Sequence, residues 1–416
     1  MNFSLILPLL VTISGAFLLV KFRFFFIAHP IKTAKDFLAA LHDRDARRSL
    51  FLALAGTLGV GNIFGVAAGI MIGGAGSLFW LFVSSVFAMV IKYAETLTVF
   101  DSRIERGGTS ALLSKIFRSH GAILSSLYAF FMLLLSLLMG AGMQGVAVMD
   151  VAESGLSIAP IFSGLIFVIL IMPCIIGTAK TTESITEILI PLTTIIYILM
   201  CFWTIIVNFA KILTVINNII FSAFEFKSVA GGLSFVAVRE GFARGILSNE
   251  AGAGTSAMAH CRSRSRDPHT AGLFAMAEVV FDSSVLCMLT GFVILLTVPD
   301  ISLYRTPMSL VCASFYSVFG RFSDVILPFI ILSFAYATVI CWYYYGRECV
   351  SLYFSVLKGI YPFLFIIFLL LSRFIRSDFL LYVIDVLLLF MSFMTLSAIA
   401  RRTHVIAKLY QIKKET

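Results

Sequence analysis

Two glycine-rich stretches decide the fold of this chain: AGTLGVGNIFG at residues 55–65 and RGILSNEAGAG at residues 244–254. Each combines a Gly-x-Gly with an asparagine inside a long apolar segment, where glycine and asparagine are poor helix formers. Backbone groups that are freed at mid-membrane are tolerated only where protein buries them or where they line a cavity. The pattern therefore predicts two interrupted transmembrane helices.

The composition places these stretches in a membrane protein. The chain has 416 residues, of which 60% are hydrophobic and 13% are charged, whereas soluble domains have about 45–50% apolar and about 25% charged residues. The formal net charge of +9 comes from Lys and Arg residues that lie between the apolar runs. This distribution indicates a lipid bilayer as the partner of the basic residues and argues against nucleic acid.

A transmembrane helix needs about 20 mostly apolar residues. The sequence predicts eleven such spans, at residues 3–27, 49–72, 77–100, 121–148, 159–177, 185–208, 235–257, 271–298, 323–346, 354–372 and 379–400. The first span is kept as a helix rather than a signal peptide, because its charges, Lys21 and Arg23, follow the apolar core. With eleven spans, most of the 31 Lys and Arg residues fall on one side if the amino terminus is outside and the carboxyl terminus is cytoplasmic.

The two glycine-rich stretches lie about half the membrane region apart, as expected when two repeats each contribute one broken helix to a shared site. Half-helix ends would offer N–H groups to a carboxylate and C=O groups to a cation. The alternative for the first stretch is helix packing through small residues. The second stretch includes Glu250, which costs roughly 2.5–3.5 kcal/mol at a helix centre and is not needed for packing.

Several classes of chemistry lack their sequence signals. The seven cysteines form no C-x-x-C pair, so no disulfide or metal framework is predicted. The six histidines lie in predicted loops, at span ends or in the tail, which argues against a histidine proton relay at mid-membrane. There is no phosphate-binding G-x-x-x-x-G-K motif. We therefore expect neither an enzyme nor a cofactor, and transport would either use an ion gradient or run downhill.

At these residues the sequence resembles the alanine or glycine:cation symporters, which are sodium:amino acid carriers of the leucine-transporter fold. The matching runs are 56–66, 73–80, 93–95, 186–191, 243–245, 248–254, 259–260, 334–336 and 342–346. The resemblance implies an all-α polytopic membrane protein with a five-plus-five inverted repeat after one extra helix. It also implies import of a small neutral amino acid, alanine or glycine, coupled to sodium across a bacterial-type inner membrane. Residues are then assigned as extra helix 1–27, cytoplasmic connector 28–48, first repeat 49–208, extracellular connector 209–234, second repeat 235–400 and tail 401–416.

The resemblance also assigns site residues. Those expected to bind the substrate are Thr57, Gly59, Val60, Gly61, Asn62, Gln144, Ser248, Asn249, Gly252 and Trp342. Those expected to bind sodium, largely through carbonyl oxygens, are Ala55, Leu58, Phe334 and Thr338. The candidates for coupling or gating are Arg244, Glu250, Glu278 and Asp282.

Each role has a simpler alternative. Trp342 would be a lipid-interface anchor, Gln144 would hydrogen-bond a neighbouring helix, and Thr338 would bond its own backbone one turn back. Lys92 and Glu95 are interpreted as a snorkelling pair or gate element rather than ligands.

The chain departs from the family pattern in three respects. Ala337 replaces a hydroxyl residue beside Thr338, which removes one oxygen from the sodium site. Glu278 precedes Asp282 by one helical turn, and two such carboxylates would repel when both are ionised. One hypothesis is that Glu278 carries a proton in addition to sodium or in its place; the alternative is an ion pair with Arg239 or Arg244.

The third departure is at Ala141 and Val146, which replace Asn residues beside Gln144 and leave the substrate's identity open. The competing functions are a channel, which would need polar rings along one pathway, and a sensor without transport. Oligomeric state has no signal in the sequence.

Overall fold

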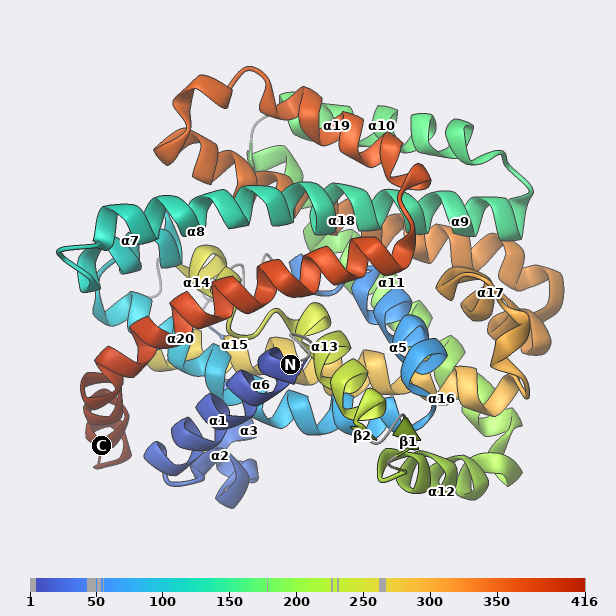
Figure 1. The fold of residues 1–416 in the computed structure, drawn as a ribbon, viewed down its shortest axis with the longest axis horizontal. Helices are drawn as coiled ribbons and strands as arrows, with labels where there is room; N and C mark the ends of the chain where they lie inside the picture. The colour runs from blue at the N-terminus through green and yellow to red at the C-terminus, as the bar shows by residue number, and fades with distance from the viewer. Residues whose placement is uncertain are drawn as a thin grey trace.

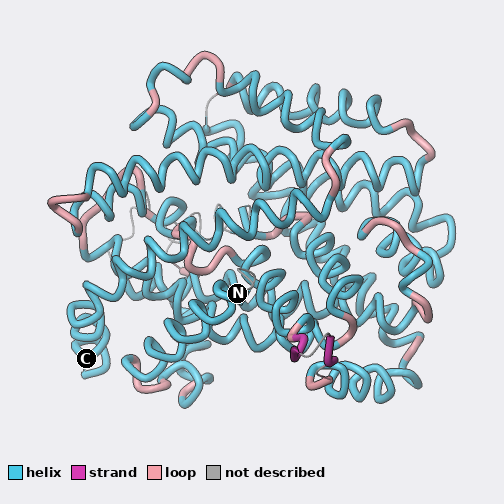
Figure 2. Tube along the Cα trace, viewed as in Figure 1, coloured by secondary structure: helices cyan, strands magenta, loops and turns pink. Residues whose placement is uncertain are grey.

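The computed structural model describes residues 5–42, 50, 54, 56–177, 179–225, 227–229, 232–261 and 267–415. Nearly all of them are helical, and the chain folds into one bundle of long, closely packed helices (Figures 1 and 2). The fold is therefore the predicted all-α class. The exception is a small antiparallel hairpin of β1 (Lys227–Val229) and β2 (Gly232–Ser234), which lies in the predicted connector 209–234.

The helices of the first half follow the chain in this order: α1 (Ile6–Lys21), α2 (Phe25–Ala28), α3 (Pro30–Ala40), η2 (Gly61–Gly65), α5 (Val66–Gly73), α6 (Gly76–Asp101), α7 (Gly108–Ile116), α8 (Gly121–Leu135), η3 (Ser136–Met143), α9 (Gln144–Leu156), α10 (Pro160–Ile176), α11 (Ala179–Val207), η4 (Phe209–Lys211) and α12 (Ile212–Ala223).

The helices of the second half are α13 (Val236–Asn249), α14 (Thr255–His260), α15 (Pro268–Val279), η5 (Val280–Cys287), α16 (Met288–Thr297), η6 (Ile301–Leu303), α17 (Pro307–Phe319), η7 (Gly320–Phe322), α18 (Ser323–Tyr353), η8 (Ser355–Leu357), α19 (Tyr361–Leu371), η9 (Ser372–Phe374) and α20 (Ser377–Glu415).

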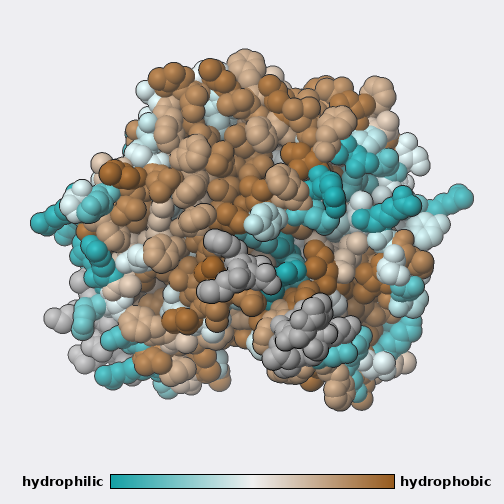
Figure 3. Space-filling view, in the orientation of Figure 1, coloured by the Kyte–Doolittle hydropathy of each residue, from teal (hydrophilic) through white to brown (hydrophobic). Residues whose placement is uncertain are grey.

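Among the described residues, six helical stretches are long and apolar enough to cross a membrane, and shorter apolar helices accompany them. The long stretches are Gly76–Asp101, Gly121–Leu156, Leu189–Val207, Pro268–Thr297, Pro307–Tyr353 and Ser377–His404. Figure 3 shows the corresponding surface: apolar side chains cover most of the visible face, and hydrophilic ones gather mainly towards its left and right edges. The chain is a multi-pass membrane protein, while the number eleven stays a prediction.

Four helices of nine or more residues lie outside the predicted spans: α3, α7, α12 and α17. Of these, α17 occupies Pro307–Phe319, between the predicted spans 271–298 and 323–346. The local sequence fixes where α17 begins, because Thr306 and Ser309 form a reciprocal capping box and Pro307 occupies the first turn. The helix has 13 residues, fewer than a span needs, so a search for 20-residue apolar runs does not detect it.

Two helices organise the core. Helix α6 packs against α1, α12, α13 and α15, and α18 packs against α8, η3, α9 and α11. Helix α6 can approach its neighbours closely because glycines face it. A β-carbon at Gly272 of α15 would meet Tyr93, and one at Gly241 of α13 would meet Trp80. The tight packing brings the polar residues of α6 into the centre of the bundle.

Candidate functional site

The first predicted helix break is present. The chain leaves helical conformation at Leu58–Val60 and becomes helical again in η2 and α5. A tight turn closes the break, in which the Gly59 N–H donates to Thr57 O at 2.8 Å. Glycine is needed here because a β-carbon at Gly59 would meet the hydroxyl of Thr338 on α18. The break therefore lies directly against α18.

The second predicted break separates α13 from α14. Glu250 follows α13 with φ 56°, and Gly252 and Gly254 have φ 89° and 84°. These left-handed conformations suit glycine and are uncommon for a glutamate. Side chains from elsewhere hold the loop: the Tyr128 hydroxyl donates to Ala253 O at 2.6 Å, and the Gly252 N–H donates to Glu95 Oε1 at 2.6 Å. The break is thus a built feature of the fold.

Polar side chains join the two breaks. Ser248 Oγ lies 2.6 Å from Asp282 Oδ2 and 3.1 Å from Asn62 Oδ1. Ser283 donates to Asp282 Oδ2 at 2.9 Å, and Asn249 Nδ2 donates to Ser283 at 3.0 Å. We call Asn62, Ser248, Asn249, Asp282 and Ser283 the central network. All five are at most 2% exposed, so the network is closed to solvent.

Three π-helical segments adjoin the central network: η2, η3 and η5. Segment η2 contains Asn62, η5 contains Asp282, and η3 ends immediately before Gln144. Short π-helical segments inside helices occur frequently at functional sites. The π-helical segments could not be predicted from the sequence, because an apolar segment has the same composition whether its turns are α-helical or π-helical.

The remaining predicted substrate residues lie around the network with differing contacts. Thr57, Val60 and Gln144 are buried, and Gly61 faces Met143 and the Leu247 carbonyl. Gln144 Nε2 donates to Met139 O on its own helix at 3.2 Å. The alternative in which Gln144 bonds a neighbouring helix is therefore wrong. Its Oε1 atom is buried and has no partner among the described residues.

Trp342 is fully buried and packs against Gly140 of η3, where a β-carbon would overlap the indole side chain. This position excludes the alternative of a lipid-interface anchor. Its indole N–H is buried without a partner in the described part of the chain.

Of the predicted sodium ligands that the structure describes, Leu58 lies in the first break, and Phe334 and Thr338 lie on α18, where Thr338 contacts Gly59. All three are at most 3% exposed. The Thr338 hydroxyl faces Gly59 and has no hydrogen-bond partner within the described residues, so it does not bond its own backbone as the alternative required. Ala55, the fourth predicted ligand, lies outside the described residues.

A second group of buried polar side chains lies beside α14. Lys92 Nζ donates to Glu278 Oε2 at 3.0 Å, His260 Nε2 lies 2.6 Å from Glu278 Oε1, and Ser256 donates to Glu278 Oε2 at 3.2 Å. We call these four residues with Glu95 the Lys92 cluster. None of the five is more than 2% exposed.

The Lys92 cluster corrects three expectations. Lys92 does not snorkel to a surface, since it is fully buried. Glu278 does form an ion pair, but with Lys92 rather than with Arg239 or Arg244, and His260 Nε2 lies against its other oxygen. His260 lies at a helix end as predicted, yet it contacts a buried carboxylate. The expectation that no histidine belongs to the buried polar site is therefore wrong for His260.

The structure also changes the interpretation of the spacing between Glu278 and Asp282, which were expected to lie one α-helical turn apart. The π-helical segment η5 begins at Val280, between the two residues, so a simple α-helical turn does not relate them. Asp282 bonds serines of the central network, whereas Glu278 belongs to the Lys92 cluster. The two carboxyl groups therefore have different partners.

A third polar group lies at the other end of α13. Arg244 Nη2 is 2.5 Å from Asp385 Oδ2 of α20, and Arg244 Nε is 3.4 Å from Glu240 Oε2. Arg239 pairs with Glu240 at 2.6 Å. We call Arg239, Glu240, Arg244 and Asp385 the Arg244 cluster.

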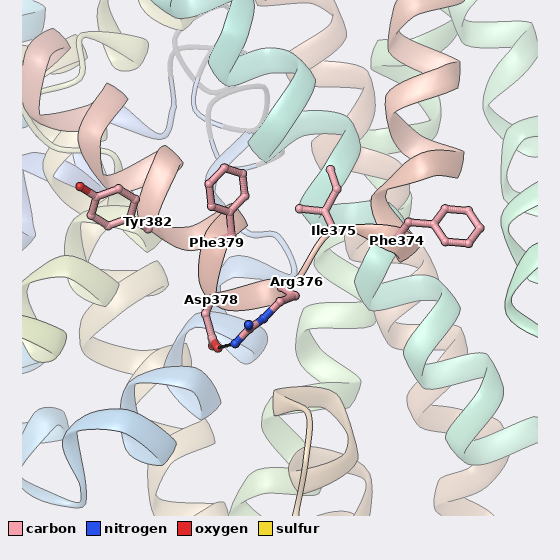
Figure 4. A pocket seen from close by; sticks show the side chains of 6 residues that line it. All are labelled: Phe374, Ile375, Arg376, Asp378, Phe379 and Tyr382. Carbon is pink, nitrogen blue, oxygen red and sulfur yellow. Dashed lines mark ion pairs between the residues drawn. The ribbon is translucent and has the colours of Figure 1, made fainter.

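One surface pocket lies apart from the residues of this site. It has a volume of about 640 Å³ and lies where η9 leads into α20, lined by Phe374, Ile375, Arg376, Asp378, Phe379 and Tyr382 (Figure 4). Its only charged groups are Arg376 and Asp378, which face one another at 3.5 Å and are largely exposed. The candidate site is therefore the closed region at the two helix breaks.

Comparisons with known proteins agree with this geometry. The model of the sodium:alanine symporter family matches residues 1–414. The chain is 33% identical to the sodium/alanine symporter AgcS of Methanococcus maripaludis, over 75% of this chain and 71% of that protein. It is 27% identical to the putative sodium/proton-dependent alanine carrier protein YrbD of Bacillus subtilis, over 73% and 66% of the two chains.

A solved structure shows the same fold. The crystal structure of MhsT in complex with L-phenylalanine covers 87% of this chain and 93% of its own, with a TM-score of 0.59 and 14% identity. This match supports a leucine-transporter fold. The family consists of transporters rather than enzymes, and its members carry out symport of an amino acid with a cation. With two broken helices around a closed polar centre, and a family model that matches almost its whole length, the chain belongs to the sodium:alanine symporter family.

Proposed function

We propose that this protein imports a small neutral amino acid, alanine or glycine, together with sodium, by alternating access. The observation that carries the proposal is the contact of Ser248 with Asn62 and Asp282, which joins the two helix breaks at one buried point. Broken helices that meet at mid-membrane supply both free N–H and free C=O groups, which suit an amino acid and a cation.

The substrate would lie between the two breaks. Backbone N–H groups around Gly59, Val60 and Gly61, with Thr57 and Asn62, would bind its carboxylate, and Ser248, Asn249 and Gly252 would face it from the second repeat. The buried, unpartnered Gln144 Oε1 is a suitable acceptor for the substrate ammonium.

Size selection would follow from the surrounding side chains. Trp342 packs on Gly140, and Met143 Cε lies 3.6 Å from the β-carbon position of Gly61. A side chain longer than a methyl group would have to displace one of these groups, which supports alanine or glycine as the substrate.

Sodium would bind beside the first break. The carbonyl oxygens of Ala55, Leu58 and Phe334 and the hydroxyl of Thr338 are oxygen ligands of the kind hard cations prefer. The unpartnered Thr338 hydroxyl facing Gly59 supports this assignment. Ala337 contributes no oxygen, so the site would have fewer ligands than the usual family pattern.

The topology and repeats also belong to the proposal. The amino terminus would lie outside and the carboxyl terminus in the cytoplasm, and residues 49–208 and 235–400 would form the two inverted repeats. Labelling of single cysteines introduced into the loops, with a reagent that does not cross the membrane, would test this orientation.

Uptake into proteoliposomes tests the function. Labelled alanine should accumulate when an inward sodium gradient is imposed, and unlabelled glycine should compete better than larger amino acids. Asn62→Ala should abolish uptake, whereas Asn208→Ala, whose side chain only bonds the Thr204 carbonyl of its own helix, should not. Gly252→Leu should also abolish uptake, because a side chain there would meet Ser392. Equal uptake without sodium would reject the sodium coupling, and uptake by Asn62→Ala equal to that of Asn208→Ala would reject the site.

A further inference from the structure

The buried acidic groups around the second helix break are not balanced by the described cations. Glu95, Glu250, Glu278 and Asp282 are at most 1% exposed, and each interacts electrostatically with the ammonium of Lys92. An ionised carboxylate that is taken out of water costs several kcal/mol unless it is paired. One ammonium, even with the His260 imidazole beside it, cannot compensate four carboxylates.

Three of the four carboxyl groups have donors that stabilise their ionised form. Glu278 contacts Lys92, His260 and Ser256. The other two accept hydrogen bonds from neutral donors. Glu95 accepts from the Gly252 N–H, and Asp282 accepts from hydroxyl groups of the central network. Hydrogen bonds to the charged form favour that form.

Glu250 differs from the other three in its donors. Glu95 Oε2 and Asp282 Oδ1 are also buried without a hydrogen-bond partner among the described residues, but the other oxygen of each of these carboxyl groups accepts a hydrogen bond. Glu250 Oε1 is buried without such a partner, and the side chain of Thr255 adds a polar interaction. The charged groups that act on Glu250 most strongly are Lys92 of α6, Asp282 of η5 and Glu278 of α15. Tyr128 of α8 and Cys341 and Tyr345 of α18 also interact with it, and Glu95 of α6 acts on the same Lys92 and Tyr128.

We propose that Glu250 is a proton-binding site, neutral in this closed arrangement, and that it exchanges its proton with water each time the break between α13 and α14 opens. The step is simple: the carboxylate takes a proton from water on the open side before the loop closes and returns it after the loop opens. The inference deepens the proposed function and rests on its alternating access. It places the proton on Glu250 rather than on Glu278, because Glu278 is paired with Lys92, whereas Glu250 has neither a paired cation nor the neutral donors of Glu95 and Asp282.

The pH dependence of uptake tests this assignment. At a fixed sodium gradient, wild-type alanine uptake should fall with rising pH by up to about tenfold per pH unit, because an ionised Glu250 must gain one proton before the site closes. Glu250→Gln is permanently neutral, so its uptake should lack this alkaline decline. Glu95→Gln is the matched control: it lies in the same buried region, keeps an acceptor for the Gly252 N–H, and should keep the decline. A wild-type profile without the decline, or a Glu250→Gln profile that keeps it, would overturn the proposal.

A second measurement decides the question if Glu250→Gln does not transport. Infrared difference spectra of purified protein in heavy water, recorded between acidic and alkaline buffer without substrate, detect neutral buried carboxyl groups directly. Wild type and Glu95→Gln should share a carboxylic acid band that Glu250→Gln lacks, and an unchanged band in Glu250→Gln would contradict the proposal. This spectrum does not depend on uptake, so a protein that transports no alanine at any pH would reject the proposed function and leave this test intact.

Discussion

The Lys92 cluster and the Arg244 cluster lie at opposite ends of the interrupted α13–α14 helix and use the same kinds of group differently. In the Lys92 cluster the ion pair is sealed, with Lys92 and Glu278 side chains 0% and 1% exposed. In the Arg244 cluster the Asp385 and Arg239 side chains are 25% and 31% exposed. Breaking the Lys92–Glu278 pair leaves a fully buried charge, whereas water reaches the Asp385 and Arg239 side chains of the Arg244 cluster. The two ends of the broken helix therefore differ in how far water reaches their ion pairs.

The largest effect should come from the sealed pair. Lys92→Met removes the cation from Glu278 and should lower the free energy of unfolding by about 3–5 kcal/mol, because it leaves a buried carboxylate without its main partner. Thermal unfolding of the purified protein in detergent, followed by fluorescence, would measure this.

The double variant Lys92→Met with Glu278→Gln sharpens that result. Removing both charges should lower the free energy of unfolding by clearly less than the summed losses of the two single variants, since the two side chains interact directly. Additive losses would mean that Lys92 stabilises the fold through packing alone, and the contrast between the two clusters would fail.

A smaller effect is expected at the wetter cluster. Asp385→Asn leaves the buried Arg244 paired with Glu240, so we expect the free energy of unfolding to fall by about 1–2 kcal/mol. The contribution of the Arg244–Asp385 pair to the stability of the wild type should also become smaller when salt is added, because salt screens partly exposed pairs. A loss as large as that of Lys92→Met would show that the Arg244 cluster is also sealed.

The smallest effect is expected at the surface. Arg106 is 62% exposed and pairs with Glu348 at 3.3 Å. This contact raises the pKa of Arg106 above its already high ordinary value, so the guanidinium keeps its charge throughout the usable pH range. Arg106→Gln should leave the unfolding temperature and the uptake rate unchanged within error, and a clear loss in either would assign this pair a structural role.

Some features of this architecture follow from local composition and could be predicted from the sequence. Others depend on contacts between residues that are far apart in the sequence. The two helix breaks were predictable, because glycine and asparagine in an apolar run oppose a continuous helix. The partner of Glu278 was not, since Lys92 lies 186 residues away and only the packing of α6 on α15 joins them. Arg244 shows both cases: its contact with Glu240 follows helical spacing, whereas its contact with Asp385 spans 141 residues.

The segment η3 has a consequence for how this protein tolerates changes in length. An α-helix turns by about 100° for each residue, and a π-helical stretch is locally wider, so the loss of one residue there could restore α-helical geometry. Deleting one residue within Ser136–Met143 would change the rotation of the Gln144 side chain and the rest of α9 relative to α8. Gln144 would then face in a different direction although no side chain had been substituted. A one-residue deletion should therefore be less tolerated in η3 than most substitutions.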